Sequence, residues 1–285
     1  MIIGDNMKKI ISILFAIICF LSLLILTIVL NINLLTKNKN IVKQTKNINY
    51  IELVSLNTIN TDNKEIYDEI YYSLQKSDLP LEKIIIFYES DYIKEVFKNI
   101  IYNSSNYLFY NKEYKKYNVN TLNKLADKKI KDKELREQVK NINYNFVNME
   151  NNIKYNIDSI DYNKIRILRY IMDNKFKVIL LSLIMISIII EIILNKEKII
   201  PYIFTSSTIC SIVDIIISIS LSFIVTKNIN NEFVLLFIKP FVEYFDRTLL
   251  ITGLVMLIIS TIYLMINQKI DNITKIVIKP RIKVK

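Results

Sequence analysis

The chain has 285 residues, of which 52% are hydrophobic and 23% are charged, and its formal net charge is +11. It contains no His, only two Gly and only two Cys. The lack of His excludes His-ligated metal sites and Ser-His or Cys-His nucleophile pairs, and the scarcity of Gly excludes phosphate-cradling loops. Both Cys lie in apolar runs, which argues against a disulfide framework. We therefore predict a non-enzymatic protein with no catalytic residues, no cofactor and no metal.

Several apolar runs of about 17–25 residues indicate a membrane protein, because about 20 helical residues cross a bilayer core. The abundance of Ile, Asn and Lys is typical of an AT-rich bacterial genome. In a membrane protein the basic excess indicates contact with anionic lipid, so the lipid bilayer is the expected partner and nucleic acid is not. The predicted fold class is mainly all-α. It is a four-span helical integral membrane protein with a mostly helical extramembrane domain of about 130 residues between spans one and two.

The first apolar run, Ile10–Leu30, is preceded by Lys8 and Lys9. It is longer than a signal-peptide core, and no small-x-small cleavage site follows, so we predict an uncleaved signal anchor. The predicted segments are a cytoplasmic N-terminus (1–9), transmembrane helix 1 (10–35), an extracytoplasmic domain (36–177), transmembrane helices 2 (178–194) and 3 (199–225), an interfacial amphipathic loop (226–247), transmembrane helix 4 (248–266) and a basic cytoplasmic tail (267–285).

Two periodic patterns predict amphipathic helices in the domain. The first follows Ser90 with the 0, 3, 4, 7, 8 spacing of one helix face. The second has the 4, 3, 4, 3, 4 spacing of a heptad seam. We expect this seam to pack inside the domain, and an intermolecular coiled coil is the alternative. The first set is Ile93, Val96, Phe97, Ile100 and Ile101; the second is Leu135, Val139, Ile142, Phe146, Met149 and Ile153.

The other parts of the domain have weaker patterns. Residues 50–59 alternate as in a short strand, and Asp62 with Glu65 forms a candidate capping box. The Tyr- and Asn-rich stretch 103–120 predicts an irregular connection. From Asp161 the sequence predicts a helix that runs without a break into the second span.

The third span carries one polar stripe on an otherwise apolar helix. Its residues are spaced 4, 3, 4 and 4, and they are Ser207, Ser211, Asp214, Ser218 and Ser222. A carboxylate at this depth must face a partner helix or a wet cavity. We interpret Asp214 as a protonated group that bonds to Ser or Thr on a neighbouring helix and holds the bundle together; a functional carboxylate is the alternative. Glu191 is expected at the aqueous edge or paired with Lys198.

The segment 226–247 places several aromatic side chains near one helix face, interrupted at Pro240, which would end or kink the helix. This composition predicts an amphipathic segment lying in the membrane interface. A buried re-entrant element and a partner-docking helix are the alternatives.

Charge asymmetry predicts the orientation. With the N-terminus inside, the short inner segments hold ten Lys or Arg and the short outer loop holds three. This favours a multi-pass protein of the cell membrane with both termini cytoplasmic. If the basic ends of the long domain are counted as well, the preference reverses.

Three functions fit these features. In the first, the extracytoplasmic domain binds a protein partner, forms a homo-oligomer or senses a stimulus. In the second, the chain is a non-catalytic subunit of a transporter or ABC-type complex, because its topology is similar to that of FtsX-like permeases. The short turn at 195–198 departs from the longer cytoplasmic loop of those permeases. In the third, Asp214 serves a proton-coupled carrier.

Overall fold

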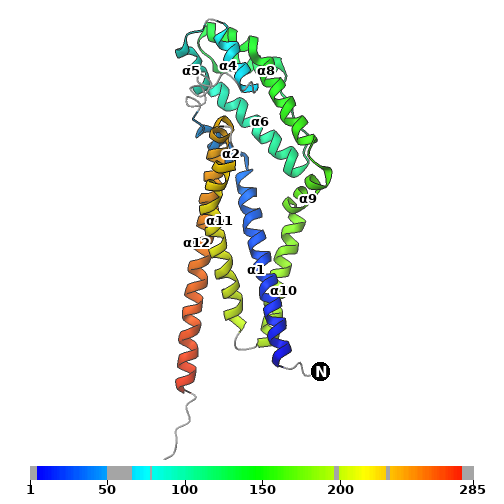
Figure 1. Cartoon of the computed structure of the whole chain (residues 1–285), viewed down its shortest axis with the longest axis vertical. Coiled ribbons are helices and arrows are strands. Elements are labelled where there is room, and N and C mark those ends of the chain that lie inside the picture. The colour runs from blue at the N-terminus through cyan, green and yellow to red at the C-terminus, as the bar shows by residue number, and fades with distance from the viewer. Residues whose placement is uncertain (1–4, 50–65, 78, 196–198, 229–231, 278–285) are drawn as a thin grey trace, which may run out of the picture. The chain divides into compact units, whose positions relative to one another are not determined.

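A computed structural model describes residues 5–49, 66–77, 79–195, 199–228 and 232–277 (Figure 1). Within these ranges every regular element is an α-helix, which confirms the mainly all-α prediction for the described part of the chain. The predicted strand at 50–59 and the capping box of Asp62 and Glu65 lie outside the described residues. The chain divides into two compact units, and each is described by itself.

The apolar unit consists of Met1–Ile32, Asn174–Leu221 and Phe245–Lys285. Its helices come from α1 (Asp5–Leu35), α10 (Asn174–Asn195), α11 (Ile199–Asn228) and α12 (Glu232–Val277), which run roughly along one axis in Figure 1. These four helices contain segments long and apolar enough to cross a membrane: Asn6–Leu35, Asn174–Leu194, Ile203–Asn228 and Ile238–Ile266. The prediction of four apolar spans is therefore confirmed in the length and composition of these helices.

The helices of the apolar unit expose their large apolar side chains and bury their polar ones. On α1, Ile13, Ile17 and Leu21 are exposed, whereas Ser12 and Ser22 on the opposite face are buried. In water such exposure would be unfavourable, because apolar surface is driven away from solvent. In lipid it is expected, since the tails are as apolar as the side chains. The pattern is compatible with a bilayer environment.

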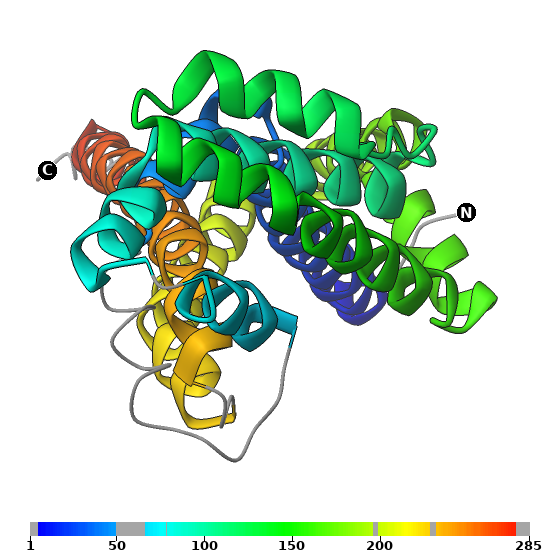
Figure 2. The same ribbon diagram turned by 90° about the horizontal axis from the view of Figure 1, so that it is seen from above.

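The helical domain consists of Asn33–Asp173 and Ser222–Tyr244. Besides the ends of α1 and α11 and the start of α12, its described helices are α2 (Asn38–Lys46), α4 (Ile66–Gln75), α5 (Leu81–Glu89), α6 (Asp91–Tyr110), α7 (Val119–Lys129), α8 (Lys133–Asp158) and α9 (Tyr162–Met172). Figure 2 shows α6, α7 and α8 packed side by side. Helices α4, α5, α6, α7 and α8 share one hydrophobic core. Phe87, Tyr92 and Phe146 are among its largest buried side chains.

The two strongest helix predictions are confirmed. Helix α6 begins after Ser90, whose Oγ accepts from the backbone N–H of Ile93 at 3.4 Å, as an N-cap does. Helix α8 begins after Asp132, whose Oδ1 accepts from the N–H of Leu135 at 2.8 Å. The heptad seam of α8 lies in the core of this domain, with five of its positions buried and Ile153 partly buried. The seam therefore packs within the chain, as expected.

The expectation of an irregular connection over 103–120 is wrong for its first half. Helix α6 continues to Tyr110, and Asn111, the C-cap residue that follows, adopts a left-handed conformation at φ 53° and ψ 32°. Asn tolerates this conformation better than most residues do. Tyr and Asn have middling helix propensities, so packing decides their state. Here Tyr110 is held by its hydroxyl, which donates to Asn33 Oδ1 at 2.7 Å.

The expectation of one helix running from Asp161 into the second span is also wrong. Helix α9 ends at Met172, and Asp173 is extended at φ −66° and ψ 146° before α10 begins at Asn174. Asp and Asn side chains compete for backbone hydrogen bonds and favour helix ends. This break coincides with the boundary between the helical domain and the apolar unit.

Helix α12 differs from the predicted division into a loop and a fourth span. It is one helix from Glu232 to Val277, with Pro240 inside it. Its first part belongs to the helical domain, where Leu236 and Phe241 pack against the core. Proline removes one backbone donor and usually breaks a helix. Here the helix stays unbroken at Pro240, and residues before and after it, Leu236 and Phe241, pack against the domain core.

Candidate functional site

The buried centre of the apolar unit is Asp214 on α11. Asp214 is fully buried, with 0% of its surface exposed. Thr27 on α1 donates from Oγ1 to Asp214 Oδ1 at 3.1 Å, and Cys210 Sγ lies 3.9 Å from Oδ2. The same Thr27 hydroxyl also lies 2.9 Å from the carbonyl oxygen of Leu24 in its own helix. Asp214 thus links α11 to α1 through a hydroxyl, which is the kind of partner that the sequence predicted.

The rest of the predicted stripe is only partly buried. Ser211 and Ser218 are buried, whereas Ser207 and Ser222 are half-buried. Ser211 Oγ donates to the carbonyl of Ser207 within α11 at 2.7 Å. Ser260 of α12 donates to Ser207 Oγ at 2.8 Å. The structure therefore joins Ser207 to α12 and Asp214 to α1, whereas the Ser211 hydroxyl bonds within α11. Ser222 belongs to the part of α11 that is assigned to the helical domain.

Helices α11 and α12 approach each other closely at Gly253. A Cβ added there would lie 3.0 Å from the carbonyl oxygen of Ser211, 3.0 Å from Ile215 Cγ1 and 3.3 Å from Asp214 Cβ. Farther along the same pair of helices, the rings of Phe204 and Tyr263 stack with centroids 3.9 Å apart. Small residues permit such close helix packing in membranes. Gly253 therefore lets α12 cover the polar face of α11 beside Asp214.

A second buried carboxylate was missed by the sequence interpretation. Glu191 on α10 is 1% exposed, and Ser12 on α1 donates to its Oε2 at 2.7 Å. The expectation that Glu191 reaches the aqueous edge is wrong, and Lys198 lies outside the described residues. Ser206 of α11 also donates to the backbone carbonyl of Ala16 on α1, at 3.0 Å. Helix α1 is thus the common partner of α10 and α11.

The signal for this role of α1 was present in its few polar side chains. Ser12, Ser22 and Thr27 are the hydroxyl residues of a run that is otherwise almost wholly apolar, and all three are buried. Asn31 follows on the same helix and is also buried. Hydroxyls in a span mark the faces that other helices contact. A row of polar side chains on one membrane helix predicts a matching row on a neighbouring helix. Helix α1 has that matching row.

The two carboxylates stand at different levels of the apolar unit. Their partners on α1, Ser12 and Thr27, are fifteen residues apart, which is about 22 Å along a helix. Glu191 and Asp214 therefore cannot share a proton as the paired carboxylates of an aspartyl centre do. Within the described ranges, no three His, Cys, Asp or Glu side chains come together as a metal site. What this arrangement provides is hydrogen bonding between helices.

The chain matches no known protein-family model, no curated protein and no solved structure. Its function must therefore be inferred from its own residues. The chemically distinctive ones are the buried carboxylates of the apolar unit and the buried polar groups of the helical domain.

Among the described residues of the helical domain, one carboxylate is buried: Glu150 on α8, at 1% exposure. The backbone N–H of Tyr117 donates to Glu150 Oε2 at 2.7 Å, which ties the connection before α7 to α8. Burial raises the pKa of Glu150 above its ordinary value, and this outweighs the Tyr117 N–H and nearby Lys116, both of which lower it. Burial likewise raises the pKa of Tyr114 to about 12. The bond between Tyr117 and Glu150 holds the connection before α7 against α8.

We expect Asp214→Asn to lower the stability of the apolar unit by less than about 0.6 kcal/mol, the average for one interhelical hydrogen bond in a membrane. The amide oxygen of Asn still accepts from Thr27. Asp214→Leu should cost about 1 kcal/mol, within the range for one interhelical hydrogen bond in a membrane. The cost stays modest because the Thr27 hydroxyl retains the Leu24 carbonyl as a partner. Thermal unfolding in mild detergent measures both variants.

The exposed Ile219 of α11 provides the control for Asp214, because Ile219→Leu changes a side chain that is 68% exposed. It should unfold at the same temperature as the unchanged protein. A double-mutant cycle with Thr27→Val isolates the bond itself. If Asn destabilises the protein as much as Leu does, the hydrogen-bond role of Asp214 is wrong.

Proposed function

We propose that the protein is a non-enzymatic interaction or sensing protein of a bacterial cell envelope. In this proposal the four apolar helices span the cell membrane, and both termini are cytoplasmic. The helical domain lies on the extracytoplasmic side, where it binds a protein partner or a second copy of the chain, or responds to a stimulus. The buried hydroxyls and carboxylates hold the spans together and take no part in chemistry.

The observation that carries this proposal is the continuity of α12. Leu236 and Phe241 pack on the core of the helical domain, and Ser260 and Tyr263 of the same helix contact α11 in the apolar unit. A change in the packing of the domain therefore acts on a helix that also forms the fourth apolar span. A domain that only anchors a partner would not need this shared element.

Hydrogen exchange tests the relay. Phe241→Ala removes a partly buried ring from the domain core, whereas Glu243→Ala changes an exposed neighbour. We expect Phe241→Ala to speed backbone amide exchange in residues 245–266 as well as in 232–244 of the protein in lipid nanodiscs. Exchange follows local opening, so it reports on loosened packing. If only 232–244 exchange faster, α12 does not relay the change and the sensing mechanism fails.

Single-cysteine labelling tests the orientation. Both native cysteines, Cys19 and Cys210, are buried and can be replaced by Ala. Cysteine is then placed at Asn148, which is exposed on α8, or at Lys283 in the basic tail. On intact cells an impermeant thiol reagent should modify position 148 and spare position 283. The reverse pattern would place the helical domain in the cytoplasm and overturn the proposed topology.

A second candidate function is also supported by the continuous α12. In a transporter or ABC-type complex, a helix shared between a domain and the membrane could transmit movement to other subunits. Purification in mild detergent separates the two candidates: a stoichiometric cytoplasmic ATPase favours the transport complex, and its absence favours the sensor. A carrier that uses Asp214 would show flux in proteoliposomes that Asp214→Asn abolishes.

A further inference from the structure

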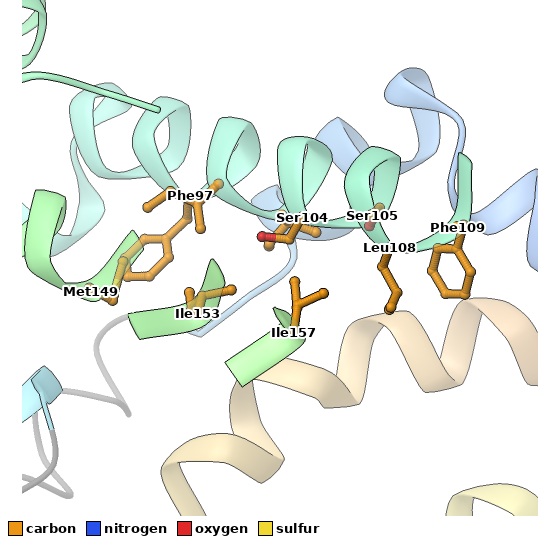
Figure 3. Close-up of a pocket in the computed structure, with 10 residues that line it drawn as sticks. Phe97, Ser104, Ser105, Leu108, Phe109, Met149, Ile153 and Ile157 are labelled. Atoms are coloured by element: carbon orange, nitrogen blue, oxygen red, sulfur yellow. The ribbon is translucent and has the colours of Figure 1, made fainter. Parts of the chain in front are cut away.

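The helical domain contains an apolar groove between α6 and α8. It has a volume of about 230 Å³, and its lining is apolar apart from Ser104 and Ser105. Figure 3 shows Phe97 and Leu108 of α6 directed toward Ile153 and Ile157 of α8. An apolar cavity of about 150 Å³ is enough to bind benzene. The groove is therefore large enough for several methylene groups.

One end of this groove is fixed next to the two chain segments that join the domain to the apolar unit. The last turn of α6, which includes the groove residue Leu108, ends at Tyr110. Tyr110 bonds to Asn33, which lies in the last turn of α1 and is the first residue of the helical domain. Arg169, four residues before the end of this domain segment at Asp173, donates to the carbonyls of Tyr107 at 2.9 Å and Leu108 at 3.2 Å. This end of the groove is thus held by one residue in the last turn of α1 and by one that lies close in sequence to α10.

Cationic side chains gather around the same turn of α6. The guanidinium of Arg169 lies 5.7 Å from the Tyr107 ring, and the ammonium of Lys154 lies 5.0 Å from it. Lys112 stands over the neighbouring Tyr110 ring at 5.7 Å. The acid Asp158 pairs with Lys154 and accepts from the Tyr107 hydroxyl. The end of the groove therefore has an excess of positive charge, which favours an anionic headgroup.

Helix α9, which follows Ile157 of the groove, has the surface of an interfacial helix. It buries Ile165 and Met172 but exposes Ile167 at 56%, Tyr162 at 72% and Tyr170 at 52%. Exposed Tyr and apolar residues beside Arg are typical of the zone between lipid tails and water. The exposed face of α9 therefore has the composition of a surface that contacts lipid headgroups.

We propose that the groove between α6 and α8 binds one acyl chain of an anionic phospholipid from the bilayer. The chain lies between Leu108, Ile153 and Ile157, and the phosphate lies near Arg169 and Lys112. Binding does not depend on which side of the membrane the helical domain occupies, because both leaflets supply phospholipid. The lipid site and the proposed sensing function can therefore fail separately.

Photo-crosslinking of the full chain tests the site. The protein is reconstituted in vesicles of phosphatidylcholine and phosphatidylglycerol that contain phosphatidylglycerol with a diazirine at the end of one acyl chain. After illumination, mass spectrometry should find lipid on residues 97–109 and 149–157 in addition to the four apolar helices. If labelled peptides come from the apolar helices alone while circular dichroism shows a folded protein, the proposal is overturned.

A variant that fills the groove gives the second measurement. Ser105→Trp places an indole in the groove, and Asn148→Trp places one at an exposed position of α8. Labelling of the groove peptides should fall about tenfold in Ser105→Trp, because displacing roughly two buried methylenes weakens binding by that factor. Asn148→Trp should label as the unchanged protein does. Equal labelling of both variants would overturn the proposal.

Two further outcomes identify a different occupant. The first outcome is that a free fatty acid with a diazirine labels the groove and that excess phosphatidylglycerol does not displace it. This would show that the occupant is not a bilayer phospholipid. Disulfide-linked dimers of Ser105→Cys, made in a background without Cys19 and Cys210, would show that a second copy of the chain covers the groove. Either result would contradict the proposal.

Discussion

Phe146→Ala should lower the free energy of unfolding of the helical domain by about 4 kcal/mol, the middle of the range for replacing a buried Phe with Ala. Phe146 is 1% exposed at the centre of the seam on α8. Its ring has edge contacts with Tyr92 and Phe97 at centroid distances of 6.1 and 6.4 Å, and it also lies 6.5 Å from Phe87. Alanine leaves a cavity that three aromatic rings cannot fill without moving. Since each kcal/mol shifts the melting temperature of a domain of this size by about 2–4 °C, unfolding should begin roughly 10 °C lower.

The matched control is Tyr144→Ala, two residues away on the same helix, where the side chain is 52% exposed. It should change stability by less than about 1 kcal/mol. Circular dichroism gives the melting temperature, and limited proteolysis shows which unit opens. In Phe146→Ala the first cuts should fall in 66–172, while the apolar helices stay protected by detergent. Equal melting temperatures for the two variants would mean that the seam of α8 is not the core of the domain.

The best sequence predictions were those in which a single helix carries the whole signal. The seam from Leu135 to Met149 could be identified because period and burial agree along α8. The stripe on α11 was identified for the same reason, and Asp214 does face a hydroxyl on another helix. In both cases the local pattern and the final packing favour the same face. Consistency of this kind makes a segment predictable.

The parts that sequence did not predict depend on which helices meet. Glu191 could be placed at the edge or in the interior, and only the position of Ser12 on α1 decides this. The continuity of α12 through Pro240 depends on a core formed more than seventy residues earlier in the chain. Pairing across long sequence separations leaves no periodic trace in either segment. The break at Asp173 was visible as an Asp-Asn pair, but its signal is weak beside the apolar run that follows.

Gly253→Leu should separate α12 from α11 and cost about 3 kcal/mol, the upper part of the range for overpacking a close contact. The obstacle is backbone, because the Ser211 carbonyl oxygen would lie 3.0 Å from the new Cβ before the rest of the side chain is added. A flexible side chain could rotate away, but a helix carbonyl cannot. Gly253→Ala should cost about 1 kcal/mol. The series Gly, Ala, Leu should therefore destabilise the apolar unit in steps.

A disulfide measures the separation directly in membranes. The hydroxyls of Ser207 and Ser260 are 2.8 Å apart, so cysteines at both positions should join α11 to α12 when Cys19 and Cys210 are replaced by Ala. Gly253→Leu should lower the yield of this crosslink, and Val255→Phe, which enlarges a 50% exposed side chain two residues away, should not. If both variants crosslink fully, α12 does not depend on its one glycine to pack beside Asp214. Helix α12 also packs on the core of the helical domain. A lost crosslink would show that the span formed by α12 has separated from α11, and the proposed relay requires that contact.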